Sequence, residues 1–156
     1  MLNYFLKNHL VDYVHQEPKN WQEAIQLSCQ TLLNQGYIKE DYVSDIIECV
    51  EKYGPYIVIV PGVAMPHASE ESNGVIGTAI SFTKFDNPVV FYDKENDEEK
   101  EASLFFTLAA KDPNSHLEHI SDLMELLTKE GMIEALQESN NIEDYKSIIE
   151  QFHLTD

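Results

Sequence analysis

The sequence predicts an α/β fold in which a mixed β-sheet is flanked by helices on both faces. Segments near both ends of the chain show the apolar periodicity of helices, whereas short apolar runs cluster in the middle. The run at residues 103–110 is almost entirely apolar, as expected for a central strand covered on both faces. The 156 residues contain no repeat and no low-complexity linker, so we expect a single domain over residues 1–156.

The first third of the chain is predicted to be mainly helical. Asn20 and Glu23 have the spacing of a capping box, and Gly36 suits the position just after a helix end. The next apolar periodicity continues until Gly54 and Pro55 interrupt it. The elements expected here are a helix at residues 2–8, an edge strand at 10–14, and helices at 20–36 and 41–53.

A group of strands is predicted next, followed by further helices. The segment at residues 56–60 has the composition of a buried strand, and a Pro-Gly pair is expected to end it. The mostly acidic run at residues 93–101 is expected to be a solvated turn. The other strands are expected at residues 74–82, 89–92 and 103–110, and the helices at 115–129, 132–138 and 142–152.

The charge of the chain limits its partners. It contains 28 acidic residues against 10 basic ones, a formal net charge of −18. Such a field opposes binding to nucleic acid or to an anionic membrane surface and favours partners with a basic face. All the basic residues are lysines, so no arginine can bind a phosphate in two places.

The chain is expected to act in the cytoplasm. Its first residues are too few and too polar for a signal peptide, and no segment approaches the ~20 apolar residues of a membrane helix. Cys29 and Cys49 fall on the apolar sides of predicted helices, so we expect reduced core cysteines; a disulfide or a reactive thiol is the alternative.

His67 is the leading candidate for chemistry. It follows Pro66 at the end of the Gly-Val-Ala-Met-Pro-His stretch, just after the strand predicted at residues 56–60. A histidine on a loop after a core strand is held rigidly and can still face a cleft. Neutral imidazole is a good nucleophile at physiological pH. The alternative is a half-buried structural histidine.

His116 is the second candidate. Ser115 and Glu118 have capping-box spacing, so Ser115 is expected to be the N-cap and His116 to lie in the first helical turn. Helix N-termini attract anions, so His116 could stabilise an anion held by His67. A surface histidine at a helix start is the alternative. His119 completes a His-x-x-His pair, which leaves open a metal site of His67, His116 and His119.

Other chemistries find little support in the sequence. The glycine-rich loops that bind nucleotides are absent, and so is the Gly-x-Ser-x-Gly motif of serine hydrolases. His9, His15 and His153 lie in polar contexts near the ends of the chain and are expected to be solvated.

Three segments resemble one protein family. They are residues 53–68, which include Pro-Gly-Val-Ala-Met-Pro-His-Ala; Asn96-Asp97 before the strand at 104–110; and residues 108–110, followed by Ser115-His116-Leu117 and a leucine-rich helix. The chain resembles, over roughly residues 2–150, the EIIA components of the bacterial sugar phosphotransferase system (PTS), in the fructose–mannitol superfamily. It looks most like the ascorbate-type branch.

The resemblance implies a phosphoryl relay without a cofactor. His67 would accept a phosphoryl group from the phosphocarrier protein HPr and pass it to a cysteine of EIIB, which works with the membrane component EIIC. His116 would hydrogen-bond the phosphoryl group. The substrate would be ascorbate or a related sugar. An EIIA-like regulatory module is the main alternative, and a histidine–metal hydrolase is a further one.

Two departures from the family pattern concern charge. The mannitol branch carries an arginine in the helix before the Pro-His strand, and this chain has Glu48 and Cys49 in that helix. Charge compensation would therefore come from backbone amides, the helix end at His116 or a lysine. Many ascorbate-type relatives are expected to carry a basic residue shortly after Pro-His-Ala, whereas Ser69 follows here.

Overall fold

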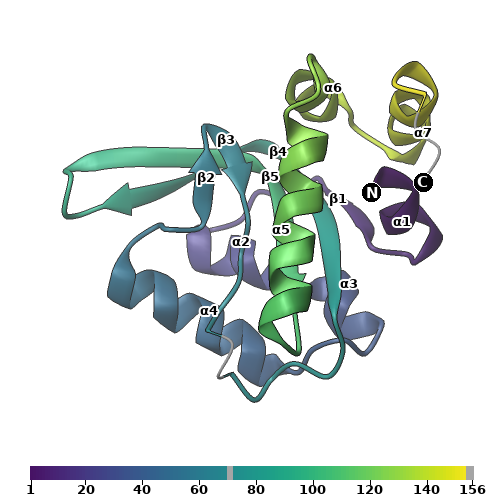
Figure 1. Cartoon of the computed structure of the whole chain (residues 1–156). Helices are drawn as coiled ribbons and strands as arrows, with labels where there is room; N and C mark the ends of the chain where they lie inside the picture. The colour runs from purple at the N-terminus through teal and green to yellow at the C-terminus, as the bar shows by residue number, and fades with distance from the viewer. Residues whose placement is uncertain (70–71, 154–156) are drawn as a thin grey trace.

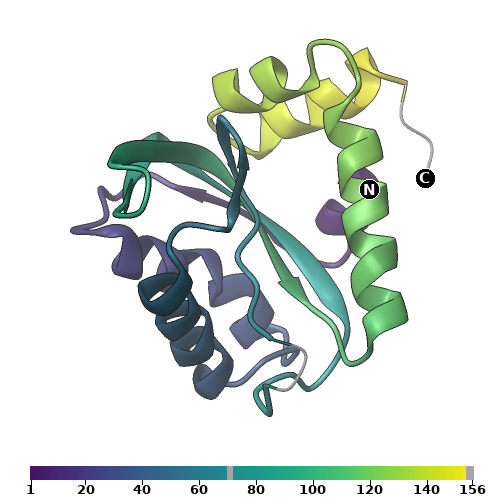
Figure 2. The same cartoon turned by 60° about the vertical axis from the view of Figure 1, so that its left-hand side comes forward.

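A mixed sheet forms the centre of the protein, and helices cover both of its faces (Figures 1 and 2). The computed structural model describes residues 1–69 and 72–153. Within them the strand order is β1-β4-β5-β3-β2; β1–β4 and β3–β5 are parallel pairs, and β4–β5 and β2–β3 are antiparallel. The strands are β1 (Val11–Val14), β2 (Val58–Val60), β3 (Gly62–Ala64), β4 (Ala79–Asp93) and β5 (Glu98–Ala109). The predicted fold class is confirmed.

The helices form two layers because each buries an apolar face against one side of the sheet. Helices α2 to α4 cover one face, and α1 and α5 to α7 cover the other (Figure 2). No helix in the described part of the chain is long and apolar enough to span a membrane. The helices are α1 (Leu2–Lys7), α2 (Trp21–Ser28), α3 (Gln30–Asn34), α4 (Glu40–Tyr53), α5 (Pro113–Leu127), α6 (Met132–Glu138) and α7 (Ile142–Gln151).

Strand β5 is central, as predicted, and separates two hydrophobic cores. Residues 102–109 are all buried. Because successive strand side chains point to opposite faces, Phe105 packs into the core under α2 and α4, whereas Leu104 and Phe106 pack into the core under α5 to α7. The predicted edge strand at residues 10–14 is confirmed as β1.

The predictions for the long hairpin need correction. One strand, β4, replaces the two strands expected at 74–82 and 89–92; it starts at Ala79, so residues 74–78 lie outside it, and it runs through a register shift between Lys84 and Val89. Pro88 lacks an amide hydrogen, which disturbs the ladder without ending the strand. The solvated turn expected at 93–101 is too long, since β5 begins at Glu98. Acidic residues can pair through their backbones when their side chains face solvent.

The segment at residues 56–60 is also different from the prediction. Only Val58–Val60 form a strand, β2, which lies half-buried at the sheet edge. The Pro-Gly pair does not end the strand region but reverses the chain into β3, a strand that was not predicted from the sequence. Gly62 has a φ of 89°, a left-handed value that glycine adopts without strain.

The helix predicted at 20–36 is divided into α2 and α3. Asn20 caps it as expected, because its side chain accepts a hydrogen bond from Glu23 N at 2.8 Å. Near Cys29 the Ser28 hydroxyl donates to the Ile25 carbonyl at 2.8 Å, and the Cys29 amide is shared between two carbonyls. Such side-chain bonding to the preceding turn locally distorts a helix.

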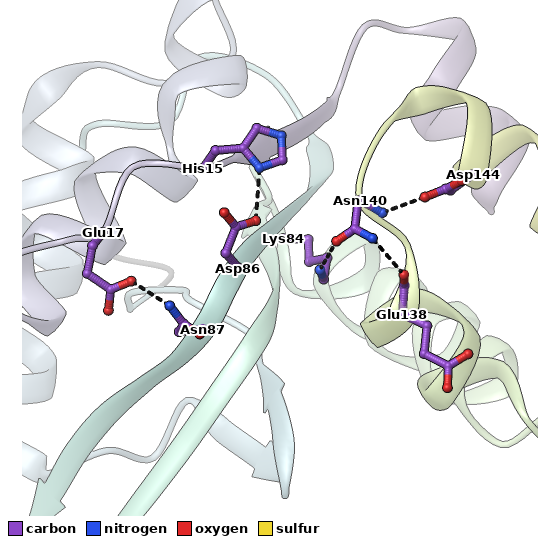
Figure 3. Close-up of polar contacts among 8 residues, drawn as sticks. All are labelled: His15, Glu17, Lys84, Asp86, Asn87, Glu138, Asn140 and Asp144. Atoms are coloured by element: carbon purple, nitrogen blue, oxygen red, sulfur yellow. Dashed lines mark hydrogen bonds and ion pairs between the residues drawn. The ribbon is translucent and has the colours of Figure 1, made fainter.

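A buried lysine attaches the C-terminal helices to the sheet (Figure 3). Lys84 on β4 is 4% exposed, and its Nζ donates to Asn140 Oδ1 at 3.4 Å. Asn140 Nδ2 donates to the Glu138 carbonyl, and Asn140 N donates to the Asp144 carboxylate. The turn between α6 and α7 is therefore fixed over one end of the sheet.

Candidate functional site

The loop that carries His67 continues from β3 along the central strand. The Met65 amide donates to the Ile57 carbonyl at 2.7 Å, and the Leu108 amide of β5 donates to the Pro66 carbonyl at 2.9 Å. Met65 and Pro66 are buried, whereas His67 is half-buried. The loop is therefore anchored to the core and presents His67 at the surface.

Two tyrosine hydroxyls bind the peptide unit that joins His67 to Ala68. The Tyr56 hydroxyl donates to the His67 carbonyl, and the Ala68 amide donates to the Tyr42 hydroxyl at 3.2 Å. Tyr42 itself donates to the Leu108 carbonyl at 2.6 Å. Both polar atoms of this peptide unit are thus held, one from α4 and one from the segment before β2.

The hydrogen bond of the His67 ring defines its tautomer. Nδ1 lies 2.7 Å from the Met65 carbonyl oxygen, and since that oxygen can only accept, Nδ1 carries the proton. The neutral ring therefore has its lone pair on Nε2. Burial is the main effect that lowers the pKa of His67, and the nearby His116 lowers it further; the bond to Met65 acts in the opposite direction. The ring is consequently kept neutral and nucleophilic.

The two histidines singled out in the sequence lie side by side. The His67 and His116 ring centroids are 5.4 Å apart, with an angle of 59° between the rings. The Tyr56 ring also stands edge-on to the His67 ring, with centroids 5.2 Å apart and an interplanar angle of 89°. The tertiary structure therefore brings His67 into contact with both an aromatic ring and a second imidazole.

The start of α5 differs from the prediction. Asp112, not Ser115, is the N-cap, and its side chain accepts a hydrogen bond from Ser115 N at 2.8 Å. Pro113 occupies the first turn, where its missing amide hydrogen costs nothing. His116 still lies in the first turn, since its amide donates to the Asp112 carbonyl.

This capping restricts the anion site expected at the helix end. The Ser115 amide is bonded to Asp112, and the Ala68 amide, next to His67, is bonded to Tyr42. Neither amide is free to bind a phosphoryl oxygen. The His116 side chain is the donor that the structure places against His67.

His119 does not join the other two histidines. It lines a cavity of about 610 Å³ together with Tyr4, Ile80 and Asp122, and neither His67 nor His116 lines it. In residues 1–69 and 72–153, no three histidine, cysteine, aspartate or glutamate side chains are grouped as a metal site requires. The three-histidine metal site has no support in this geometry.

The remaining histidines and the cysteines follow the predictions in most respects. His9, His15 and His153 are exposed, and His15 Nδ1 contacts the Asp86 carboxylate at 2.9 Å (Figure 3). Both cysteines are free; Cys29 is buried, which raises its pKa to about 12, whereas Cys49 is half-buried.

Three residues near the site were not predicted from the sequence: Tyr42, Tyr56 and Asp112. For Asp112 a signal was present, because Asp-Pro is a common N-cap and first-turn pair. Tyr42 lies four residues before Ile46 on the buried face of its helix, which predicts burial but not the bond to a distant loop. For Tyr56 we find no such signal.

A sequence profile described as "Phosphoenolpyruvate-dependent sugar phosphotransferase system, EIIA 2" matches residues 4–152. The chain belongs to this family. A "mannitol-specific cryptic phosphotransferase enzyme IIA component" of Escherichia coli K12 is 39% identical over 131 residues, 84% of this chain and 86% of that protein. An "ascorbate-specific PTS system EIIA component" of the same strain is 31% identical over 136 residues, 86% of each chain.

Solved structures of EIIA proteins have the same fold. The solution structure of the mannitol-specific cryptic enzyme IIA CmtB from Escherichia coli superimposes with a TM-score of 0.80 at 33% identity, covering 96% of this chain and 98% of that one. The mannitol enzyme IIA solved in complex with phosphorylated enzyme IIB from Escherichia coli gives a TM-score of 0.72 at 21% identity, covering 90% and 94%. The latter likeness concerns the fold alone.

The family resemblance predicted from the sequence is therefore confirmed. This EIIA-family chain is a phosphoryl-relay component of a sugar phosphotransferase system and, in general terms, a transferase. The relatives carry the names of two different substrates.

Proposed function

We propose that this chain accepts a phosphoryl group from HPr on His67 Nε2 and passes it to a cysteine of an EIIB partner. The observation that carries the proposal is the hydrogen bond from His67 Nδ1 to the Met65 carbonyl. It leaves Nε2 as the nucleophilic nitrogen of a half-buried ring next to a second histidine.

The transfer exchanges one P–N bond for another. The His67 Nε2 lone pair attacks phosphorus, and the donor imidazole nitrogen leaves with the electron pair of the broken bond. Because Nδ1 keeps its proton, phosphorylated His67 carries a positive ring, which is a good leaving group. In the next step the EIIB thiolate attacks phosphorus and the electron pair returns to Nε2. The Met65 carbonyl favours the positive ring throughout.

His116 is proposed to donate a hydrogen bond to the phosphoryl oxygens. Its ring is the neighbour of His67 on the side of α5. The chain has no arginine to stabilise the negative charge of a phosphoryl group, and the Ser115 and Ala68 amides are already bonded. The His116 side chain is therefore the donor that we propose for this charge. Fixed donors of this kind stabilise charge that develops in a transition state.

The partners and the sugar that we propose are inferred from the names of related proteins. The mannitol enzyme IIA was solved with its phosphorylated enzyme IIB, which suggests a comparable EIIB for this chain, working with a membrane EIIC. We propose uptake and phosphorylation of ascorbate or a related sugar, because the relatives include ascorbate-specific and mannitol-specific components. The net charge of −18 would speed encounter with basic partner faces. We also propose a cytoplasmic location.

A reconstituted relay tests the function. The chain is incubated with phosphoenolpyruvate, enzyme I and HPr, and its intact mass is measured before and after addition of EIIB. We expect the mass of one phosphoryl group to appear in an alkali-stable, acid-labile form and to move to EIIB. Separate reactions with an ascorbate-type and a mannitol-type EIIB identify the branch. No mass gain, or a phosphoryl group stable in acid, contradicts the proposal.

A further inference from the structure

We infer that Tyr56 is a positioning residue for His67, acting with Tyr42 as a two-tyrosine clamp on the peptide unit between His67 and Ala68. The inference rests on the proposed role of His67 as phosphoryl acceptor. Tyr56 binds the carbonyl of this peptide unit, and Tyr42 binds its amide. Together the two hydroxyls determine how the plane of this peptide unit is oriented.

The clamp connects the loop to rigid elements. Tyr42 lies on α4, is 3% exposed and donates to the Leu108 carbonyl of the central strand. The Leu108 amide also donates to the Pro66 carbonyl. Leu108 of β5 therefore holds the loop directly before His67 and, through Tyr42, after it. This inner half of the clamp is part of the core.

The outer half depends on Tyr56. Its side chain is 37% exposed, and its hydroxyl donates to the His67 carbonyl. Its ring also stands edge-on against the His67 imidazole. Tyr56 therefore contacts both the backbone and the ring of His67, whereas the Met65 carbonyl fixes only Nδ1.

Orientation of the acceptor matters because phosphoryl transfer requires the attacking nitrogen in line with the leaving group. If the His67 carbonyl rotates, the ring follows through its own backbone, and the bond from Nδ1 to Met65 is strained. The expected consequence is a smaller fraction of molecules with Nε2 correctly placed. Binding of the donor protein need not change.

The test is Tyr56→Phe, which removes the hydroxyl and keeps the ring. Tyr53→Phe is the matched control, because Tyr53 lies three residues earlier, is 65% exposed, and its hydroxyl makes no hydrogen bond within the described residues. We expect kcat for phosphoryl acceptance to fall about three- to tenfold in Tyr56→Phe with an unchanged KM for phospho-HPr, and to stay within about twofold in Tyr53→Phe.

A second readout does not require transfer. The ¹⁵N chemical shifts of the His67 ring report the proton on Nδ1, and we expect Tyr56→Phe, but not Tyr53→Phe, to move them towards a mixture of tautomers. Unchanged His67 shifts together with a wild-type kcat would overturn the inference. If the wild-type chain takes no phosphoryl group, the proposed function fails, and the ring shifts alone decide whether Tyr56 positions His67.

Discussion

His116 and His119 lie three residues apart on α5, yet their surroundings differ. The centroid of the His116 ring lies 5.4 Å from that of His67, and His67 belongs to a loop anchored to the central strand. His119 lines a cavity with Tyr4 and Asp122, and its buried Nδ1 has no hydrogen-bond partner among the described residues. Burial lowers its pKa, as it does for His67.

The difference shows that the surroundings of a histidine depend on which other helices, strands and loops pack against it. Its spacing from another histidine in the same helix does not predict them. In the sequence the His-x-x-His pair suggested one metal site. In the structure, the His116 ring lies against His67 in the loop after β3, whereas His119 lines a cavity to which Tyr4 of α1 also contributes. We therefore propose that His116 assists phosphoryl transfer, and we assign no part in it to His119.

The largest expected effect separates His67 from His119. His67→Gln should reduce phosphoryl acceptance more than about 1,000-fold, because the nucleophile is lost. His119→Gln should leave the rate within about twofold, since this side chain does not line the proposed site. Intact mass after incubation with phospho-HPr measures both variants. Equal phosphorylation of the two variants would contradict the proposal that His67 is the phosphoryl acceptor.

His116→Gln should have the next largest effect. Removing one donor to a developing charge typically lowers a rate by about 10²-fold, so transfer to EIIB should slow by roughly that factor. Rapid-quench measurement of a single turnover gives the rate, and His119→Gln serves again as the control. A transfer rate close to wild type would mean that His116 is a structural neighbour of His67 only.

A pH titration examines the environment of His67 more finely. Since its folded pKa is lowered, the ring should stay neutral, and able to accept a phosphoryl group, below the ordinary value of about 6.5. Neutral His67 contributes stability that is fully present above about pH 6.5 and is lost as the pH falls through the folded pKa.

The titration is followed by NMR of the His67 ring, with His67→Gln used to assign the signal. In His116→Gln we expect the pKa of His67 to rise, because the electrostatic effect of His116 on it is removed, but to remain lowered by burial. A midpoint at or above about 6.5 in the wild-type chain would show that His67 is not desolvated in solution.

The smallest effect is expected for His119→Leu. A buried nitrogen without a partner costs stability, so an apolar replacement should leave the free energy of unfolding unchanged or raise it by about 1 kcal/mol. Urea unfolding compares it with His119→Gln, which keeps a polar group in the cavity. A loss of more than about 1 kcal/mol in the leucine variant would reveal a partner for Nδ1.

Much of the fold could be predicted from local patterns. The central strand, the edge strand and the helices near both ends were visible because apolar periodicity reflects which face of an element is buried. The errors concern β4, the acidic part of β5 and the hairpin at Gly62. There, pairing between backbones determined the structure, and side-chain composition carries little information about it.

The α/β class and the family could be predicted from local pattern and from the Pro66-His67 motif, which also made His67 and His116 the candidate site residues. Which histidines lie side by side, and which groups hold them, depends on the packing of distant segments. Ala68 and Tyr42 are 26 positions apart, and Tyr42 and Leu108 are 66 positions apart. Contacts over such separations exist only after α4, the loop and the central strand have packed together.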